Sequence, residues 1–511
     1  MNSRTFQHTW DSAVQHHTDR PFLIFRAESG DVTTWTYGEF DAVVARTAGA
    51  LRSIGVEPAS PVHVALRNCP AFVALWLAAA RLGAWLVPVD PASAPRDIAG
   101  QVRRVRPAVG VCATARADAY REGAGDQVPT VLALAEDASD VAAGDGPLSC
   151  PNPVTSPAPV RPEDRMAVMF TSGTTSEPKG VDLTQANYAH VATVMAEAAQ
   201  LRPHHRWHVT LPLFHANAQY YCFAPAIAVG ASVALSATFS ASRWLRHARE
   251  LEVTHASLFA APIRMILART APDETPLHLE HLWYAQSLGV EHYEQFARLV
   301  GTRPRQLYGM TETVAIVSAD AGARAVHDVI GTPVAGRHIH VVDPVTGEEA
   351  APGAPGELHV LGTPGRDLFS GYLDDEKTTT RAFSPAPEGT WFATGDLVSR
   401  DADGVLRFTG RVDDVIKVSG ENVSLSEVEA AVAQAPGVLE AAVVGAMDPV
   451  RDKVPVAYIV ARDPAEPPRE EELVRWATRN LAPAARPRAW HLIEELPRTS
   501  VGKVRRFRVG R

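Results

Sequence analysis

The chain has 511 residues, of which 46% are hydrophobic and 21% charged, and its 49 Lys and Arg against 58 Asp and Glu give a formal net charge of −9. That length allows roughly three domain-equivalents of about 150 residues each. The composition excludes a disordered, collagen-like or coiled-coil protein. An acidic chain also has no overall positive field for nucleic acid or an anionic membrane, so we expect neither as a partner.

The cysteines and the apolar stretches indicate a cytoplasmic protein. The four cysteines contain no C-x-x-C pair, as is usual for free thiols in a reducing compartment. The longest apolar stretch, Ala71–Pro88, is interrupted by Arg81 and is too short to span a bilayer, and the start of the sequence lacks a signal peptide. The pairs His16-His17 and His204-His205 are adjacent in sequence, a spacing that zinc sites seldom use, so we expect no metal on the histidines.

From about residue 36 to 320, segments with helical periodicity alternate with short apolar runs. Such alternation predicts parallel strands joined by crossover helices, hence a doubly wound α/β body. The proline-rich stretch Gly144–Glu163 predicts a surface loop or a joint between subdomains. The first predicted elements are a helix at Tyr37–Ser53, a strand at Val62–Leu66, a helix at Ala71–Leu82 and a strand at Trp85–Val89.

After about residue 330 the pattern changes to short strands with turn signals, which predicts a β-barrel-like subdomain over about 330–410. From Gly410 a third pattern predicts a small α+β domain at 411–511, so that the large N-terminal domain covers 1–410. Ser424 and Glu427 form a capping-box pattern at the start of a helix through about Gln434. The other predicted elements after residue 330 are strands at His338–Val342, Glu357–Leu361, Trp391–Phe392, Val405–Phe408, Val415–Val418, Glu440–Val444 and Pro455–Val460, a helix at Arg469–Asn480 and a strand near Trp490–Glu494.

The segment Met166–Val181 carries the most informative motif. Five hydroxylated residues and one glycine occupy Thr171–Ser176, where backbone N–H groups and hydroxyls can cradle phosphate oxygens, and Lys179 adds a cation. The motif is not a Walker A loop, because Pro178 and Gly180 stand where that loop needs a glycine and a Ser or Thr. The alternative interpretation is a Ser/Thr-rich surface turn.

Four further segments combine residue types that suit nucleotide chemistry. An aromatic ring, a glycine, a hydroxyl and a carboxylate in Gln306–Thr313 suit base stacking followed by phosphate and Mg²⁺ contacts. Trp391–Leu397 places a carboxylate after a Thr-Gly turn, where it could take ribose hydroxyls. Gly410–Gly420 lies where the patterns change, and Pro497–Lys503 puts a lysine in a flexible turn. Each of these alone is more often an ordinary turn or strand end.

Taken together, in this order and at these separations, the five segments resemble the adenylate-forming superfamily. Its members include acyl- and aryl-CoA synthetases, adenylation domains of peptide synthetases and firefly-type luciferases. The resemblance covers nearly the whole chain and includes a weaker match at Gly371-Tyr372. Tyr284-Ala285-Gln286 stands where many relatives have a glycine-rich segment, which suggests the branch of carnitine/crotonobetaine-type CoA ligases.

The resemblance implies that the chain joins a carboxylate to the α-phosphate of ATP, releases pyrophosphate and passes the acyl group to CoA. Tyr308 would pack on adenine, and Asp396 and Arg411 would take the ribose hydroxyls. The residues at the ATP- and AMP-binding positions of the family are Thr171, Ser172, Gly173, Thr174, Thr175, Lys179, Tyr308, Gly309, Thr311, Asp396 and Arg411.

The catalytic residues implied by the resemblance are Thr311 at the α-phosphate, Glu312 as the Mg²⁺ ligand, His215 beside the acyl pocket and Lys503. Lys503 would bridge the carboxylate and the α-phosphate when the C-terminal domain closes. The reaction brings an anion to an anion, so positive charge and aligned donors must offset the repulsion in the transition state.

The C-terminal domain of relatives rotates between the two half-reactions, and Asp413 matches the hinge position. Gly420 matches a glycine that lines the thiol tunnel. Near His215 the chain lacks the aspartate that holds the ammonium group in α-amino-acid adenylation domains, so we expect a carboxylic acid with a largely apolar body. The predicted acyl pocket consists of His215, Gln219, Tyr220, Phe223, Gln286, Leu288 and Met310.

Three alternatives stay open at this point. The enzyme could deliver the adenylate to a carrier protein or a partner enzyme, because CoA contacts cannot be read from the sequence. A non-catalytic nucleotide-binding protein is disfavoured, since it would have no need of Lys503. A luciferase is disfavoured because the terminus lacks a Ser-Lys-Leu signal. We expect ATP, Mg²⁺ and CoA as the small-molecule requirements and a monomer or homodimer.

Overall fold

The structure is a computed structural model of the full chain. It describes residues 4–144, 146–171, 178–271, 273–322, 325–344, 346–418, 421–448, 452–498, 504 and 506–510. Unit 1 comprises Met1–Ala285, Glu294–Val317 and Leu361–Trp391, and unit 2 comprises Gln286–Tyr293, Ser318–Val360 and Phe392–Arg511. The domain boundary predicted at residue 410 lies within unit 2. That residues 411–511 form a separate mobile domain stays a prediction.

The first sheet of unit 1 confirms the predicted parallel α/β arrangement. The strands β1, β10, β9, β11, β12 and β13 run parallel in this order, and β2 adds to β1 in the antiparallel direction. Their carboxyl ends therefore share one edge, which is where open α/β sheets bind ligands. The strands are β1 (Pro21–Arg26), β2 (Val32–Thr36), β9 (Arg206–Val209), β10 (Ser232–Ser236), β11 (His255–Phe259), β12 (His281–Ala285) and β13 (Arg305–Tyr308).

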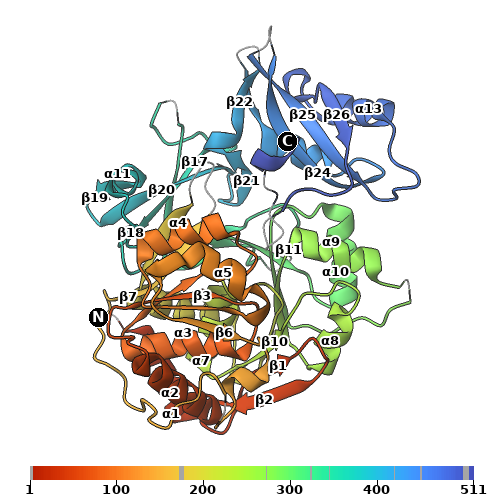
Figure 1. The fold of residues 1–511 in the computed structure, drawn as a ribbon. Coiled ribbons are helices and arrows are strands. Elements are labelled where there is room, and N and C mark those ends of the chain that lie inside the picture. Colours follow the sequence, from red (N-terminus) through yellow and green to blue (C-terminus); the bar gives the residue numbers. More distant parts are fainter. Residues whose placement is uncertain are drawn as a thin grey trace. The chain divides into compact units, whose positions relative to one another are not determined.

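The second sheet of unit 1 has the order β18-β8-β7-β4-β3-β5-β6. Strands β7, β4, β3, β5 and β6 are parallel, whereas β8 is antiparallel to β7 and β18 is antiparallel to β8. Helices α4 and α5 lie on one face of this sheet and α3 lies on the other (Figure 1). The strands are β3 (Pro61–Ala65), β4 (Trp85–Pro88), β5 (Val109–Ala113), β6 (Val131–Leu134), β7 (Arg165–Thr171), β8 (Lys179–Thr184) and β18 (Gly371–Tyr372).

The helices of unit 1 follow the predicted periodicity closely. The first predicted helix is confirmed with its bounds: α2 covers Tyr37–Ser53 and opens with a capping box between Thr36 and Glu39. The others are α1 (Phe6–His17), α3 (Pro70–Leu82), α4 (Pro95–Val105), α5 (Ala117–Ala124), α6 (Gln185–Ala198), a π-helix (Asn217–Phe223), α7 (Ala224–Val229), α8 (Trp244–Glu250), α9 (Ala260–Arg269), α10 (Val290–Val300), whose start belongs to unit 2, and α11 (Glu376–Ala382).

Helix α3 is the long apolar stretch of the sequence, and every one of its residues is buried. An all-apolar helix is buried on every side, in keeping with its place in the core. Arg81, which interrupts the apolar run, is 1% exposed and forms an ion pair with Asp41 of α2. Among the described residues, no helix is long and apolar enough to cross a membrane.

Unit 2 contains the short strands predicted after residue 330. Strands β16 (His338–Val342), β17 (Pro355–Gly362) and β20 (Gly389–Arg400) form a sheet in this order, and β21 (Leu406–Arg411) pairs with β20. Strand β20 is much longer than the predicted Trp391–Phe392, because its pairing with β21 continues through Arg400. Two-residue strands β14 (Ser318–Ala319) and β15 (Thr332–Pro333) pair with each other, and β19 (Phe383–Ala386) belongs to unit 1.

The last part of unit 2 is the predicted α+β fold. Its sheet has the order β23-β22-β25-β24, with β26 parallel to β25. The hydroxyl of Ser424 caps α12 by accepting the Glu427 backbone N–H at 3.3 Å. The elements are β22 (Val415–Val418), β23 (Glu421–Ser424), α12 (Leu425–Val432), β24 (Val438–Asp448), β25 (Asp452–Ala461), α13 (Glu470–Asn480) and β26 (Ala489–Leu492).

Arg506 ties the end of the chain to two segments of unit 2. Its guanidinium donates two hydrogen bonds to Glu429 of α12, at 3.1 and 3.0 Å, and forms an ion pair with Asp414, which precedes β22. This bidentate geometry is the strong form of an arginine–carboxylate contact. The carboxylate of Glu429 also accepts the backbone N–H of Val443 on β24, so the contact reaches the sheet.

We expect Arg506→Met to destabilise unit 2 by about 2 kcal/mol, because Asp414 and Glu429 would lose their shared cation while remaining half-buried. The midpoint of urea unfolding followed by tryptophan fluorescence measures this loss. Arg479→Met on the exposed side of α13 is the matched control. An unchanged midpoint in Arg506→Met would show that the ion pairs contribute nothing to stability.

Candidate active site

Lys179, Tyr372 and Glu312 meet in unit 1 although the sequence separates them widely. Strand β18 pairs with β8 through Tyr372 and Val181, which brings Tyr372 beside the start of β8. The Lys179 Nζ lies 5.0 Å from the centroid of the Tyr372 ring, and the Tyr372 hydroxyl donates to Glu312 Oε1 at 3.2 Å. A cation and a buried carboxylate are thus joined through one tyrosine, an arrangement suited to phosphates and a divalent cation.

The two strands that flank the predicted phosphate loop, β7 and β8, pair with each other up to the loop. Thr171 ends β7 opposite Lys179, which begins β8, and the Thr171 Oγ1 donates to the Lys179 carbonyl at 3.5 Å. The loop between them includes Ser172, Gly173, Thr174 and Thr175, which lie outside the described residues. Their phosphate contacts stay a prediction.

The segment Tyr308–Thr313 leaves β13 at its carboxyl end and turns sharply. The Thr313 hydroxyl accepts the backbone N–H of Met310 at 3.0 Å and donates to the carbonyl of Met310 at 3.1 Å, which fixes the turn. Thr311 is half-buried, whereas Glu312 is 6% exposed. A Cβ on Gly309 would stand 2.6 Å from the Tyr221 hydroxyl oxygen, so this position needs glycine for close packing.

In unit 2, Asp396 and Arg411 face each other on β20 and β21. They are register partners, and Arg411 Nη1 lies 3.3 Å from Asp396 Oδ1. The Thr394 hydroxyl donates to the Leu358 carbonyl at 2.8 Å and accepts the backbone N–H of Asp396 at 3.1 Å. These bonds fix the Thr-Gly turn that carries Asp396, and the binding of ribose hydroxyls by this pair stays a prediction.

Three predicted positions lie at or beyond the end of β21. Asp413 is exposed in the single 3₁₀ turn Val412–Asp414, which links β21 to β22. An exposed one-turn link is able to absorb a backbone rotation, so the placement suits a hinge. Gly420 and Lys503 lie outside the described residues, and their roles stay predictions.

The residues of the predicted acyl pocket divide by exposure. His215 and Met310 in unit 1 are half-buried, whereas in unit 2 Gln286 is exposed and Leu288 is buried. Gln219, Tyr220 and Phe223 are fully buried on the π-helix, a helix type that often marks functional sites.

The amide of Gln219 is bonded within the protein. Its Oε1 accepts the Tyr188 hydroxyl at 2.7 Å and its Nε2 donates to the Leu213 carbonyl at 2.6 Å. These bonds fix the segment that leads into His215 and leave the Gln219 amide one N–H and one lone pair.

Comparison with family models identifies the family to which the chain belongs. The family model described as AMP-binding enzyme matches residues 10–373, and the model described as AMP-binding enzyme C-terminal domain matches residues 427–503. The chain belongs to the AMP-binding enzyme family. The match covers the region of Lys179, Tyr372 and Glu312 and confirms the superfamily to which the sequence motifs pointed.

Named relatives of this AMP-binding enzyme cover almost the whole chain. A crotonobetaine/carnitine–CoA ligase of Salmonella arizonae is 28% identical over 504 residues, which is 97% of this chain and 96% of the relative. A protein of the same name from Proteus mirabilis is 28% identical over 513 residues, again 97% and 96%. These relatives carry the name of the branch that Tyr284-Ala285-Gln286 suggested.

Solved structures of AMP-binding enzymes share the fold. An anthranilate CoA ligase in complex with anthranoyl-AMP has a TM-score of 0.88 at 22% identity, covering 99% of this chain and 96% of its own. ATP-bound MatB from Rhodopseudomonas palustris has a TM-score of 0.86 at 23% identity, covering 99% and 98%. The predicted fold class, a large α/β domain with a β-rich part and a small α+β domain, is confirmed by these likenesses.

The structure of this AMP-binding enzyme brings three potential metal ligands together away from the nucleotide residues. Ligand atoms of His204, His205 and Glu280 lie within 4.8 Å of one another. However, His205 Nδ1 accepts the Arg202 backbone N–H at 3.0 Å, so a neutral ring carries its proton on Nε2, which lies 3.1 Å from Glu280. A metal needs a free lone pair on that nitrogen, and the contact therefore fits a hydrogen bond from His205 to Glu280 better than a metal site.

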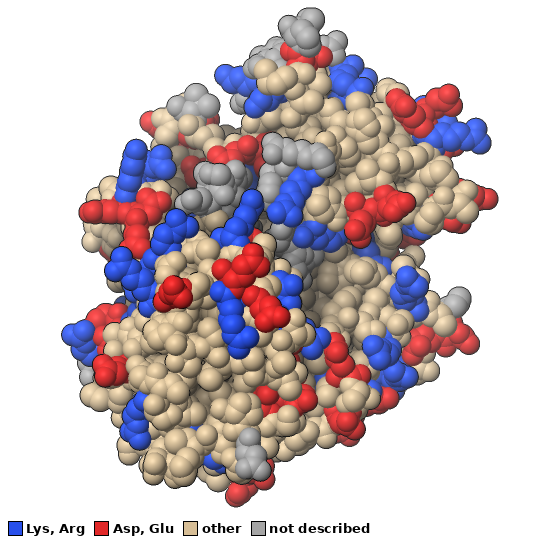
Figure 2. Space-filling view, viewed as in Figure 1, with Lys and Arg blue, Asp and Glu red and all other residues tan. Residues whose placement is uncertain are grey.

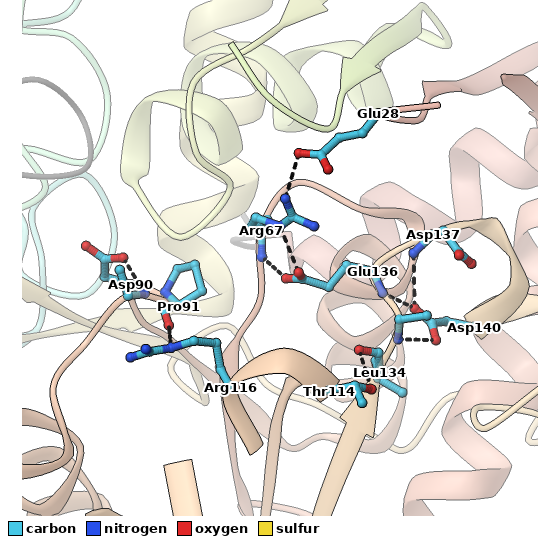
Figure 3. Close-up of polar contacts among 12 residues, drawn as sticks. Glu28, Arg67, Asp90, Pro91, Thr114, Arg116, Leu134, Glu136, Asp137 and Asp140 are labelled. Atoms are coloured by element: carbon cyan, nitrogen blue, oxygen red, sulfur yellow. Dashed lines mark hydrogen bonds and ion pairs between the residues drawn. The ribbon is translucent and has the colours of Figure 1, made fainter. Parts of the chain in front are cut away.

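Buried carboxylates near the second sheet have structural partners (Figure 3). Glu136 accepts both the backbone N–H and the Nε–H of Arg67, at 2.6 and 2.8 Å, and Arg67 also binds Glu28 at 2.7 Å. Asp140 accepts the backbone N–H groups of Ala135 and Glu136 at 2.9 and 2.7 Å, and burial raises its pKa. These groups fasten the loops that follow β3 and β6.

Sequence reasoning underestimated one residue of the site. The sequence analysis named Tyr372 only within the weaker superfamily match Gly371-Tyr372 and gave it no role, yet its side chain contacts both Lys179 and Glu312. The strand pairing that brings it there joins segments almost 200 residues apart, and nothing in the local sequence announces that pairing. On the face shown in Figure 2, Lys and Arg are intermixed with Asp and Glu.

Proposed function

We propose that this AMP-binding enzyme is an acyl-CoA synthetase that activates a carboxylic acid with ATP and transfers the acyl group to CoA. The observation that carries the proposal is the Lys179–Tyr372–Glu312 arrangement, which holds a cation and a Mg²⁺-binding carboxylate next to the phosphate-loop strands. The family match supports the nucleotide chemistry, and the CoA ligases among its relatives support the acceptor.

In the first half-reaction, a carboxylate oxygen attacks the α-phosphorus and pyrophosphate leaves with the bonding electron pair. Lys179 stabilises the negative charge on the leaving phosphates, and Thr311 donates to the α-phosphate. Glu312 would hold Mg²⁺, which supplies further charge neutralisation when bound. Asp396 and Arg411 orient the ribose, and Lys503 bridges the two reacting groups.

In the second half-reaction, the thiol sulfur of CoA attacks the acyl carbon, the thiol proton is lost and AMP leaves as the anion. His215 borders the acyl group, and Gly420 lets the pantetheine arm approach. The alternative acceptor is the thiol of a carrier protein, which needs the same adenylating residues. We expect the enzyme to act in the cytoplasm as a monomer or homodimer.

The substrate is a carboxylic acid with a largely apolar body. The pocket residues Tyr220 and Phe223 are apolar or aromatic on the buried π-helix, and His215-Ala216-Asn217 offers no carboxylate for an ammonium group. Relatives are named for acids as different as carnitine and anthranilate, so the family alone does not select one.

ATP–pyrophosphate exchange across a panel of aliphatic, aromatic and hydroxylated carboxylic acids tests the proposal. Mass spectrometry of the products with and without CoA then identifies the acceptor. Exchange with one acid and a CoA-dependent acyl-CoA product would support it. Exchange with no acid would contradict the enzyme activity, and acyl-AMP that never becomes acyl-CoA would favour the carrier-protein alternative.

The hinge position gives a separable prediction. Asp413→Pro fixes φ in the exposed turn between β21 and β22, so we expect thioester formation to slow by about tenfold while adenylate formation falls less. Rapid-quench measurement of each half-reaction separates the two rates. Asp413→Ala, which keeps the backbone free, is the control, and equal losses in both half-reactions would argue against a hinge.

A further inference from the structure

Arg104 lies on α4, outside every motif considered so far, and its side chain reaches the strands around Lys179. The guanidinium Nη1 donates to the carbonyl of Pro178 at 2.8 Å, and Nη2 donates to the carbonyl of Leu373 at 2.6 Å. Its Cζ also lies 5.2 Å from the centroid of the Phe170 ring. One half-buried side chain of α4 therefore contacts both ends of the segment Phe170–Pro178 and also Leu373, which is almost 200 residues further along the chain.

Each of these contacts is next to a residue of the site. Pro178 directly precedes Lys179, and Leu373 directly follows Tyr372. A planar guanidinium with two parallel donors fixes both the distance and the direction of its two acceptors. Arg104 thus holds the backbone before Lys179 and after Tyr372, and the Tyr372 hydroxyl in turn donates to Glu312.

Strand β18 needs such an anchor because it is short. It has two residues, Gly371 and Tyr372, and it lies at the edge of its sheet. The Leu373 N–H donates to the Gly180 carbonyl at 2.8 Å, and its own carbonyl then accepts Arg104. Other contacts also hold this strand, among them the Tyr372 backbone N–H donated to the Thr379 hydroxyl at 2.9 Å, and Arg104 adds a direct link from its end to the carbonyl of Pro178 beside Lys179.

We propose that Arg104 is a positioning residue for the β- and γ-phosphates of ATP, acting through Lys179 and Tyr372. The inference rests on the proposed function, because it uses the assignment of Lys179 to those phosphates. Since AMP lacks both phosphates, loss of Arg104 weakens ATP binding and leaves AMP binding unchanged. An arginine with a merely structural role would affect both nucleotides alike.

The test compares Arg104→Met with Arg104→Lys, which keeps the charge but loses the fork. Arg103→Met changes the neighbouring exposed residue of α4 and is the matched control. Calorimetry gives the Kd of ATP and of AMP without any acid, and pyrophosphate exchange gives KM for ATP and for the acid. We expect Arg104→Met to raise the Kd and KM of ATP by about 10- to 100-fold, with AMP, the acid and Tm nearly unchanged. Arg104→Lys should lie between Arg104→Met and the wild type.

Unchanged ATP binding in Arg104→Met would overturn the inference, and so would an equal weakening of ATP and AMP. If Arg104→Met does not fold, the selective loss of ATP binding in Arg104→Lys decides the question in the same way. A wild type that exchanges pyrophosphate with no acid contradicts the proposed function. A wild type that is active, together with an Arg104→Met protein that binds ATP equally well, contradicts only the role of Arg104.

Discussion

Replacing Lys503 with alanine is expected to lower the rate of acyl-adenylate formation by on the order of 10²- to 10³-fold, the loss that follows removal of one preorganised donor from a developing negative charge. The carboxylate and the α-phosphate are both anionic, so the step depends on cationic groups aimed at the transition state. Pyrophosphate exchange measures this half-reaction directly. Thioester formation from supplied acyl-AMP should be affected far less, because that step no longer needs the bridge between carboxylate and phosphate.

Lys453→Ala is the matched control for this experiment, since Lys453 is an exposed lysine on β25 of the same unit. Thermal unfolding of both variants should resemble that of the wild type. Undiminished exchange in Lys503→Ala would remove this lysine from the mechanism. A loss of both half-reactions to the same extent would instead indicate a damaged fold.

Local sequence signals predicted most elements of this fold. Helix α2 was predicted with its bounds because its apolar residues recur with helical period, and the structure adds the capping box of Thr36 and Glu39 at its start. Strand β22 was predicted equally well. The extension of β20 beyond Trp391–Phe392 was missed because its alternating small and polar residues become a strand only through pairing with β21.

Contacts between distant residues were beyond such reasoning. Arg81 was read as an interruption of an apolar run, whereas the fold pairs it with Asp41, which is 40 residues away. The hydrogen bond of Tyr372 to Glu312 spans 60 residues, and that of Arg104 to Leu373 spans 269. The motifs identified the chemistry of the site, but the residues that hold its groups in place follow from tertiary pairing.

Acid should unfold unit 1 because several of its histidines are buried in neutral form. Burial lowers the pKa of His63 to about 4 and the pKa values of His208 and His255 to about 3, from an ordinary value of 6.5. Neutral groups surround them: His63 bonds to the Tyr120 hydroxyl at 2.7 Å, His208 to Ser236 at 3.1 Å and His255 to Thr254 at 2.8 Å. Neighbouring histidines, His247 beside His208 and His204 and His205 beside His255, lower these pKa values further, since two adjacent rings do not readily both take up a proton.

The sign of the pH dependence follows from where the protons bind. Below about pH 6.5 the unfolded chain takes up protons on these three rings, whereas the native protein does so only near pH 3 to 4. The stability that these neutral rings contribute is therefore complete above about pH 6.5 and is lost as the pH falls from 6.5 toward 3 to 4. At about 1.4 kcal/mol per group and pH unit, these three groups contribute about 4 kcal/mol per pH unit to the slope. His247 and His281, whose pKa values burial also lowers, steepen it further. Two pH units would remove a large part of the stability of an ordinary domain.

Urea unfolding at a series of pH values between about 7 and 5 measures this slope. His208→Gln should flatten it by about 1.4 kcal/mol per pH unit, because it removes one of the protonation sites that appear on unfolding. The same substitution at His338, which is exposed on β16 in unit 2, is the control. Stability that stays constant or rises as the pH falls would contradict the neutral burial of these rings.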